Sequence, residues 1–375
     1  MKRIVAWLLC LCLLLAGCGG QTAGDQSTVD HTTDGTVDNT TDSTVDNTTD
    51  TTEDNTTEGP PDPPPVLYRH PLNGSLSETP YTGRATAVVI NNIKACLPLH
   101  GIGEADMIYE LETEGGITRL LAIFSDFSEV TRLGPVRSNR SFFNSISSAH
   151  DAPVIHCGGS EWGLNGYYTD TKLKVPNWAH INEQSNGRYF FRDRDRYNSG
   201  YAWEHTLFTS GEKLLQGLKD KGYDKVYEQT RDHGLLFSDD VALTGEAAGK
   251  VTVTFNANKT TTMTYDAATG LYNAAQYGQD MTDGNTEKTV TFANVLVLNT
   301  KQWQKYDGYY YRSFYTLIGE GEGYLAIDGQ IVPIKWSRKS LNEPFVYTYA
   351  DGSPVSLKAG TTYVGISPKK PGWEA

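Results

Sequence analysis

The chain has 375 residues and a formal net charge of −13 at pH 7, and 11 of its 45 acidic residues lie between Gly19 and Pro65, where no Lys or Arg occurs. Leaving these out, together with two basic residues at the start of the chain, gives 34 acidic and 30 basic residues from Val66 onward, a net charge of −4. The acidity therefore comes largely from one segment, and the rest has no basic surplus of the kind that nucleic acid binding requires.

The N-terminus has the pattern of a bacterial lipoprotein signal. Basic residues precede a mainly apolar run from Ile4 to Ala16, which is too short to span a bilayer as a helix. The run ends in Leu15-Ala16-Gly17-Cys18, which resembles the lipobox that is cleaved before its cysteine. We therefore expect 1–17 to be a signal peptide and Cys18 to carry a lipid, so that the mature protein is anchored on the extracytoplasmic side of the bacterial membrane. The alternative is an ordinary secretory signal with a chance cysteine.

Residues 18–65 are predicted to form a flexible tether. Thr28 to Gly59 consists of four octads, TVDHTTDG, TVDNTTDS, TVDNTTDT and TEDNTTEG. They have almost nothing to bury, so chain entropy keeps them disordered. The prolines of 60–65 stiffen the end of the segment toward polyproline II. A coil of this length would reach on the order of 40 Å, which suits a spacer through a cell wall.

The remaining 310 residues are enough for two domains with cores of their own. We predict an α+β architecture, with a mixed α+β domain over 66–237 and a mostly β domain over 238–375. Thr209 and Glu212 have the spacing of a capping box, which predicts a helix running toward Lys221. Alternating or apolar runs bounded by turn residues predict strands. The clearest are Ala85–Ile90, Pro153–His156, Val251–Phe255, Val290–Leu298, Tyr324–Asp328 and Ile331–Trp336.

Several ordered motifs are similar to those of one bacterial family. In the first domain they are Ala87-Val88-Val89-Ile90-Asn91-Asn92, Ala105-Asp106-Met107-Ile108-Tyr109-Glu110, Glu114-Gly115-Gly116-Ile117-Thr118-Arg119, Gly134-Pro135-Val136-Arg137-Ser138-Asn139-Arg140, His156-Cys157-Gly158-Gly159-Ser160 and His205-Thr206-Leu207-Phe208-Thr209-Ser210. In the second they are Ile327-Asp328-Gly329 through Lys335-Trp336, and Gly360-Thr361-Thr362-Tyr363-Val364. Over nearly all of Val66–Pro368 the chain resembles YerB-like bacterial lipoproteins, whose two domains are of unknown function. The resemblance implies an anchored envelope protein and supplies no mechanism.

The segment YELETEGGITRLL, from Tyr109 to Leu121, predicts a β-hairpin with an unusual charge pattern. Its glutamates at 110, 112 and 114 alternate along one strand, and Gly115-Gly116 suits a two-residue turn with positive φ. In that register Glu112 lies opposite Arg119, which neutralises it, and Glu110 lies opposite Leu121.

These glutamates are the catalytic candidates of the sequence. Neighbours on one face of a strand would be about 7 Å apart, a separation that suits the acid and the base of an inverting glycosidase. The family pattern has acidic residues at the positions of Glu110 and Glu114, so the resemblance makes these two the pair to consider. The alternative is a solvated, salt-bridged sheet face.

The segment from Gly134 to Arg140 is a candidate anion site. Ser138 could cap a following helix, on which Arg137 and Arg140 would be neighbours. A helix N-terminus with two guanidinium groups attracts a carboxylate or a phosphate, and Arg119 could contribute to the same site. The alternative is that Arg137 and Arg140 pair with Glu110 and Glu114 inside the domain.

A Gly-rich turn, His156-Cys157-Gly158-Gly159-Ser160, offers backbone donors to a ligand, with His156, Ser160 and the distant His205 as candidate binding residues. Cys157 could be a nucleophile, although a buried structural thiol is the simpler interpretation. A disulfide with Cys96, the other cysteine after position 18, is a further alternative. The histidines lack metal-ligand spacing, so we expect no metal and no cofactor.

A short span of the second domain is rich in aromatic residues, which could stack on sugar rings or on a protein partner, or could simply pack within a sheet. They are Trp303, Tyr306, Tyr309, Tyr310, Tyr311, Phe314 and Tyr315. The sequence therefore favours an envelope lipoprotein that binds a cell-wall component or a partner protein. The alternative is a glycan hydrolase or lyase of the cell wall that uses Glu110 and Glu114.

Overall fold

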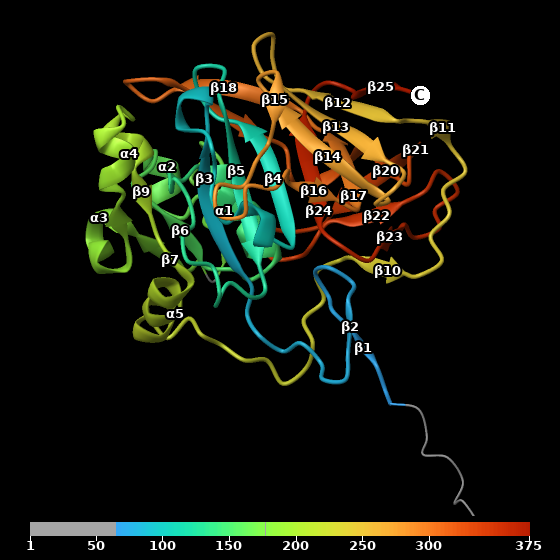
Figure 1. Cartoon of the computed structure of the whole chain (residues 1–375), viewed down its shortest axis with the longest axis horizontal. Helices are drawn as coiled ribbons and strands as arrows, with labels where there is room; N and C mark the ends of the chain where they lie inside the picture. The colour runs from blue at the N-terminus through green and yellow to red at the C-terminus, as the bar shows by residue number, and fades with distance from the viewer. Residues whose placement is uncertain (1–64, 177) are drawn as a thin grey trace, which may run out of the picture. The chain divides into compact units, whose positions relative to one another are not determined.

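One mixed sheet, which takes strands from both halves of the chain, organises the fold (Figure 1). The computed structural model describes residues 65–176 and 178–375, and these pack as one unit. In spatial order the 11 strands are β11 (Glu246–Ala247), β21 (Gln330–Arg338), β20 (Gly319–Ile327), β17 (Asn294–Asn299), β24 (Thr362–Ser367), β4 (Met107–Glu112), β5 (Thr118–Phe124), β3 (Thr86–Asn92), β6 (Val154–His156) and β7 (His180–Asn182), with β22 (Val346–Thr348) also paired to β21.

The two halves of the chain meet where β24 pairs in parallel with β4, a register that sets Gly365 opposite Glu110. Every residue of β3, β4, β5 and β24 is buried, as expected for central strands that are covered on both faces. On one face of the sheet, side chains such as Ile108 pack against the second sheet. On the other, side chains such as Leu111 pack against α1 (Ser141–Ala149).

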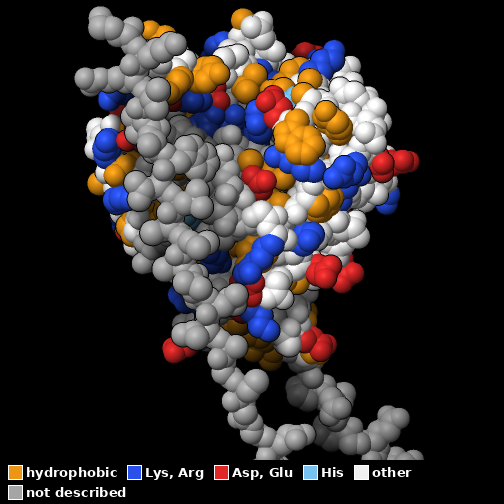
Figure 2. Space-filling view, turned by 90° about the vertical axis from the view of Figure 1, so that its left-hand side faces the viewer, with side chains coloured by type: hydrophobic (Ala, Val, Ile, Leu, Met, Phe, Trp, Pro, Cys, Tyr) orange, Lys and Arg blue, Asp and Glu red, His pale blue; other side chains and the backbone are white. Residues whose placement is uncertain are grey.

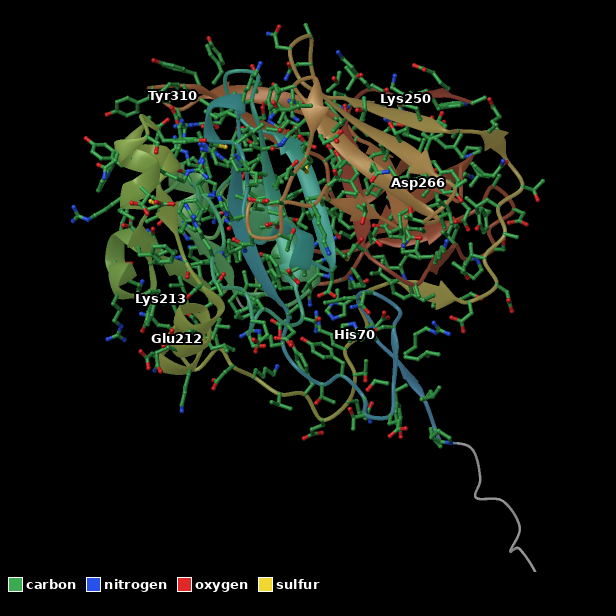
Figure 3. The ribbon with its side chains drawn as sticks, viewed as in Figure 1. His70, Glu212, Lys213, Lys250, Asp266 and Tyr310 are labelled. Atoms are coloured by element: carbon green, nitrogen blue, oxygen red, sulfur yellow. The ribbon has the colours of Figure 1, made fainter. Side chains whose placement is uncertain are left out.

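The second sheet has six strands from the C-terminal half. They are β15 (Gln279–Asp280), β14 (Leu271–Gln276), β13 (Thr260–Asp266), β12 (Lys250–Thr254) and β25 (Gly372–Glu374) in spatial order, with β16 (Thr291–Phe292) paired to β14. Figure 3 labels Lys250 and Asp266 at the ends of β12 and β13, on the side of the molecule away from the helices. The alternation of buried and half-buried residues along β12 and β14 explains why these strands cover the main sheet with one face only.

Smaller elements surround the two sheets. Four two-stranded pairs are formed by β1 (Tyr68–Arg69) with β2 (Leu76–Ser77), β8 (Phe191–Arg192) with β9 (Leu207–Phe208), β10 (Leu236–Ser238) with β23 (Ser356–Lys358), and β18 (Gln302–Tyr306) with β19 (Tyr311–Tyr315). The other helices are α2 (Glu161–Leu164), α3 (Glu183–Asn186), α4 (Arg194–Asn198) and α5 (Gly211–Asp220), and the 3-10 turns are η1 (Lys94–Cys96), η2 (Ile102–Glu104), η3 (Gly187–Tyr189) and η4 (Trp203–His205). Helices α2 to α5 gather at the β6–β7 end of the main sheet (Figure 1). The uncovered part of that end of the molecule shows Lys and Arg side chains beside hydrophobic ones (Figure 2).

The predicted α+β class is confirmed, and each predicted strand overlaps an observed one. The run Val290–Leu298 is divided between β16 and β17 at Ala293. Both predicted domains contribute strands to the main sheet, and the boundary at residue 237 stays a prediction. Among the described residues no helix has the length and apolar character needed to cross a membrane. The signal, Cys18 and nearly all of the tether lie outside the described residues.

The predicted capping box of the last helix is wrong by one residue. Helix α5 is capped by Ser210, whose hydroxyl accepts a hydrogen bond from the Lys213 backbone N–H. Thr209 is still extended, since its backbone bonds to Leu133 and its hydroxyl donates to the Tyr189 carbonyl. The helix therefore starts one residue later than the pattern predicts.

The predicted hairpin register is also wrong by one residue. The turn is longer than two residues, because Thr113 N–H bonds to the Ile117 carbonyl at 2.8 Å and Gly115 and Gly116 both take positive φ within it. Arg119 consequently lies opposite Leu111. Since a shift of one residue moves a side chain to the other face of a sheet, Arg119 faces away from the strand face that carries the first two glutamates.

Candidate functional site

The structure divides the three hairpin glutamates between two separate environments. Glu110 is fully buried at the centre of the main sheet and points toward the second sheet. Its Oε1 accepts hydrogen bonds from Asn92 at 2.8 Å and Thr118 at 2.6 Å. Its Oε2 accepts from Thr261 at 2.8 Å and Tyr363 at 2.7 Å. Both carboxylate oxygens are thus fully engaged inside the protein.

Lys259 is the cation that balances Glu110, with its Nζ 3.1 Å from Glu110 Oε1. The ammonium group also donates to Thr261 at 2.9 Å and Gln276 at 2.6 Å, and it lies 4.7 Å from the centre of the Tyr277 ring. Burial lowers the pKa of Lys259, and the charge of Glu110 opposes that effect. Because Lys259 is buried as well, the pair is an internal link between the two halves of the chain. Glu112 lies nearby and accepts a hydrogen bond from Asn256 at 2.9 Å.

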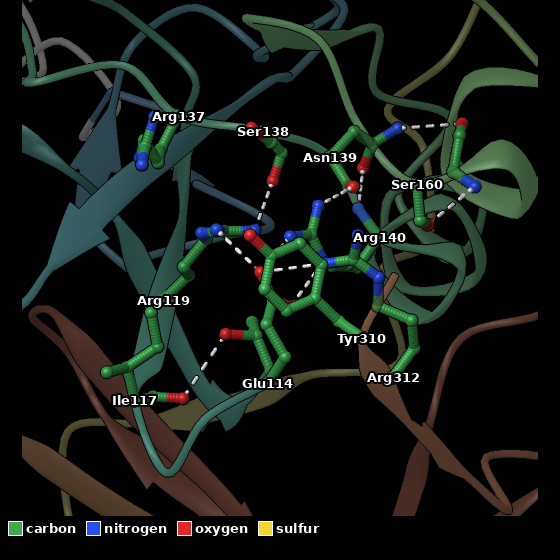
Figure 4. A network of polar contacts seen from close by, with 12 residues as sticks. Glu114, Ile117, Arg119, Arg137, Ser138, Asn139, Arg140, Ser160, Tyr310 and Arg312 are labelled. Carbon is green, nitrogen blue, oxygen red and sulfur yellow. Dashed lines mark hydrogen bonds and ion pairs between the residues drawn. The ribbon is translucent and has the colours of Figure 1, made fainter. Parts of the chain in front are cut away.

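Glu114 lies beyond the end of β4, in the hairpin turn, and is surrounded by arginines (Figure 4). Its carboxylate lies 3.1 Å from Arg119 Nη2 and 3.0 Å from Arg312 Nη1. Arg140 donates to both carboxylate oxygens, with a distance of 2.8 Å from its Nε to Oε2. Three guanidinium groups therefore converge on one carboxylate, whose side chain is only 13% exposed.

The electrostatics of this cluster reflect crowded positive charge. Burial alone would raise the pKa of Glu114, but the hydrogen bond from Arg140 and the charges of the arginines lower it to about 2. Burial, and next the charge of Arg140, lower the pKa of the Arg119 guanidinium. The buried Nε of Arg119 also has no hydrogen-bond partner among the described residues. Glu114 alone does not satisfy the donors and the charge gathered around it.

A fourth arginine, Arg137, extends the cluster toward solvent. Its side chain is 26% exposed, and Nη2 lies 3.3 Å from the carboxylate of Glu204, which is itself 51% exposed. The intervening Ser138 joins the two parts, since its carbonyl accepts a hydrogen bond from Arg119 at 2.8 Å. We refer to Arg119, Arg137, Arg140 and Arg312 around Glu114 as the arginine cluster.

The predicted helix-capping role of Ser138 is wrong. Helix α1 begins at Ser141, with Arg140 at its N-cap position and no side chain as the cap. Arg137 and Arg140 therefore precede the helix and are not neighbours on its surface. The chain is extended here because Val136 and Asn139 form bridges to Ile90 and Gly159. Of the pairings predicted for Arg137 and Arg140 with Glu110 and Glu114, only that of Arg140 with Glu114 is present, and Arg137 pairs with Glu204 instead. The predicted pairing of Arg119 with Glu112 is wrong, because Arg119 contacts Glu114.

The histidines and the serine of the predicted Gly-rich site have internal partners. His156 is buried and contacts the Gly158 carbonyl at 2.8 Å and His180 Nδ1 at 3.0 Å. Ser160 caps α2, where its hydroxyl accepts from the Gly163 N–H. His205 Nδ1 lies 3.0 Å from the Asn91 amide. Residues 65–176 and 178–375 contain no group of three or more His, Cys, Asp or Glu side chains arranged to hold a metal ion.

The two described cysteines are free thiols. Cys157 Sγ donates a hydrogen bond to Glu183 Oε2 at 3.2 Å. Burial, together with this carboxylate, raises the pKa of Cys157 to about 12. The thiol is therefore protonated at neutral pH, and the arrangement does not activate it as a nucleophile.

Arg312 is the residue of the cluster that sequence reasoning missed. It lies on β19, where its Nε donates a hydrogen bond to the Asp307 carboxylate at 2.6 Å. Its guanidinium group lies over the Tyr310 ring, 4.8 Å from the ring centre. The signal in the sequence is its position inside the aromatic run from Trp303 to Tyr315. That run is divided in the structure: Phe314 and Tyr315 are buried, whereas the tyrosines at and beside the hairpin tip are exposed. These are Tyr306, Tyr309, Tyr310 and Tyr311.

Comparison with known proteins identifies the family. Two family models, described as the N-terminal and C-terminal domains of a protein of unknown function, DUF3048, match residues 72–224 and 251–364. The chain belongs to the DUF3048 family. It is 28% identical over 310 residues to a putative lipoprotein, YerB, of Bacillus subtilis (strain 168). This alignment covers 80% of the present chain and 86% of that protein. The crystal structure of B. subtilis YerB matches with a TM-score of 0.67 over 80% of this chain and 97% of that one. The predicted resemblance is thus confirmed.

Proposed function

We propose that this DUF3048 protein is an extracytoplasmic lipoprotein, anchored through Cys18, whose arginine cluster binds an anionic component of the cell wall. The anchor is supported by the lipobox around Cys18 and by the description of its B. subtilis relative as a putative lipoprotein. The observation that carries the binding function is the excess of guanidinium groups around Glu114. The membrane would hold the protein through the lipid, and the cluster would face the wall.

The composition of the cluster suits an anionic ligand. Its four arginines face three carboxylates, those of Glu114, Glu204 and Asp307, which leaves one positive charge uncompensated. Guanidinium groups bind carboxylate and phosphate groups through paired hydrogen bonds, and they remain charged at any physiological pH. A ligand anion at this place would be attracted by the whole cluster, not by a single residue.

The exposed edge of the cluster can exchange partners at little cost. The ion pair between Arg137 and Glu204 is partly exposed at both ends, and such pairs contribute about 1 kcal/mol or less. Arg137 can therefore turn to a ligand without a large loss. Arg119 and Arg140, both nearly buried, keep their bonds to Glu114 and to backbone carbonyls and contribute their positive field.

The geometry does not favour the alternative function, hydrolysis of wall glycans by Glu110 and Glu114. A glycosidase requires a carboxylic acid that is protonated at working pH and a second carboxylate that faces the same bond. The pKa of Glu114 is lowered to about 2, so it is ionised at neutral pH and has no proton to donate. Glu110 is fully buried, with both oxygens bonded to protein groups. Binding is therefore the function that the site supports best.

Co-sedimentation with purified bacterial cell walls tests the proposal. The soluble chain from Gly19 onward would be mixed with intact walls and with walls stripped of their anionic polymers, over a series of salt concentrations. We expect retention that decreases as salt rises, because charged contacts at the surface are screened, and no release of soluble fragments. Failure to bind either wall preparation at low salt would refute binding, and release of glycan fragments would favour the hydrolase.

A further inference from the structure

We infer that the ligand of the arginine cluster is an extended anionic glycan, whose sugar rings stack on two separate aromatic subsites while its charged groups lie on the arginines between them. The first subsite consists of Tyr309 and Tyr310 at the β18–β19 hairpin tip. The second consists of Trp203 in η4 and Tyr197 in α4. The inference rests on the proposed function and adds the class of polymer to it.

An unbroken series of contacts leads from the hairpin tip into the arginine cluster. The Tyr310 ring lies 4.8 Å from the guanidinium of Arg312, which in turn contacts the Glu114 carboxylate at 3.0 Å. Figure 4 shows the Tyr310 ring beside the converging side chains of Glu114 and Arg140. Tyr310 therefore borders the site, and this residue is 59% exposed. Next to it, Tyr309 is 83% exposed.

A second series of contacts continues on the other side of the cluster. Arg137 pairs with Glu204 at 3.3 Å, and the neighbouring Trp203 is 55% exposed. The Arg192 guanidinium lies 4.7 Å from the Trp203 ring, and Tyr197 packs edge-on to the same ring at 5.5 Å. In Figure 3 Tyr310 lies on the side of the molecule that carries α4. The two series of contacts thus connect both aromatic subsites to the arginine cluster, which we call the strip; Arg137 and part of Arg312 are its accessible members within the cluster.

The alternation along this strip is the property that identifies the ligand. Large aromatic side chains that remain this exposed point to an interaction surface, since their rings offer an apolar face beside a polar edge. An interface for a folded protein would have a contiguous apolar centre with a polar rim. Here the order is reversed, with charged residues in the middle and aromatic rings at the ends. A glycan that carries anionic substituents offers the matching alternation of apolar ring faces and negative charges.

The charge of the strip supports the same assignment. Arg192, which lies over the Trp203 ring, places a further guanidinium group at the end of the strip that carries the second subsite. A polymer that reaches both subsites gains the second contact at a high effective concentration, so its affinity should rise with chain length.

Equilibrium binding of size-fractionated probes tests the inference. The probes are peptidoglycan glycan strands and anionic wall polymer, each as long chains and as single repeating units, with poly-glutamate as an acidic polypeptide. The variants are Trp203→Ala, Trp203→Phe and Tyr309→Ala. Tyr68→Ala is the matched control, because Tyr68 is a 43% exposed aromatic on β1. Melting curves confirm that each variant is folded.

We expect at least one of the two glycans to bind about tenfold or more tightly as a long chain than as a single unit. Trp203→Ala and Tyr309→Ala should each remove most of that gain, whereas Trp203→Phe and Tyr68→Ala should retain it. Equal affinity for long and short glycans, unaffected by Trp203→Ala, would overturn the two-subsite inference and leave the proposed function standing. Poly-glutamate bound as tightly as the long glycans would also overturn it. Binding of no wall polymer at all would refute the proposed function itself.

Discussion

Replacing Glu114 by Gln removes one negative charge from the centre of three guanidinium groups and leaves the shape of the side chain almost unchanged. Arg119 and Arg140 are only 3% and 5% exposed, so water cannot replace the lost charge efficiently. Arg119 already has a buried Nε without a hydrogen-bond partner among the described residues. The substitution should therefore destabilise the fold, because three like charges then repel one another with less compensation.

The magnitude follows from the pKa of Glu114. A carboxyl group whose pKa falls from its ordinary 4.5 to about 2 on folding contributes about 3 kcal/mol to the free energy of unfolding at neutral pH. Because the folded pKa is the lower one, this contribution is complete above pH 4.5 and is lost as the pH falls through 2. At pH 3 about half of it should remain.

Urea unfolding of the wild type and of Glu114→Gln at pH 7 and at pH 3 measures both quantities. We expect a difference of about 3 kcal/mol at pH 7 that is roughly halved at pH 3. Glu204→Gln is the matched control, since Glu204 is 51% exposed and pairs with Arg137, and it should cost about 1 kcal/mol or less. Equal stability of Glu114→Gln and the wild type at pH 7, or a difference that does not change with pH, would refute the reasoning. At temperatures where Glu114→Gln is folded, it should bind anionic wall polymer at least as tightly as the wild type, because it leaves the arginines less compensated.

Three further predictions address the anchor, the tether and the buried ion pair. Cys18→Ala should release the protein from the membrane fraction, and unchanged extractability would contradict a lipid anchor. Deleting Thr28–Gly59 should leave the melting temperature of the soluble chain nearly unchanged, whereas a drop of several degrees would reveal contacts that its composition does not predict. Lys259→Met should cost about 3–5 kcal/mol in urea unfolding, because it leaves Glu110 buried without its cation, and the added change Glu110→Gln should recover part of that loss. If Lys259→Met alone were as stable as the wild type, the ion pair between Lys259 and Glu110 would contribute nothing to stability.

Local sequence patterns predicted several core strands and helix α5, and failed where a tertiary contact decided the outcome. The alternation along Val251–Phe255 predicted β12, and a capping pattern predicted α5 to within one residue at its start. The hairpin register required the geometry of the 113–117 turn, which two adjacent glycines do not specify. The resulting shift of the register by one residue decides on which face of the sheet Arg119 lies.

The candidate site was predictable only where its residues lie close together in the sequence. The sequence placed Glu114, Arg119 and Arg140 within a few dozen residues of one another, and they do meet. Arg312 could not be found in this way, because it reaches Glu114 from a hairpin nearly 200 residues later in the chain. Lys259 was equally hidden, since nothing in its local sequence marks it as the buried partner of Glu110. Both contacts join the two halves of the chain, and the β19 hairpin also bonds to the glutamate hairpin through the Ser313 N–H and the Thr113 carbonyl.

The central claim, that the arginine cluster binds an anionic wall component, is tested most directly by two charge reversals that differ only in position. Arg137→Glu alters the exposed edge of the cluster, and Arg188→Glu makes the same change at η3, where Arg188 is 70% exposed and pairs with Asp220. Binding of anionic wall polymer by the soluble chain should weaken about tenfold or more in Arg137→Glu at low salt, remain at the wild-type level in Arg188→Glu, and converge among the three proteins at high salt. Equal affinity of both variants and the wild type at low salt would contradict the account.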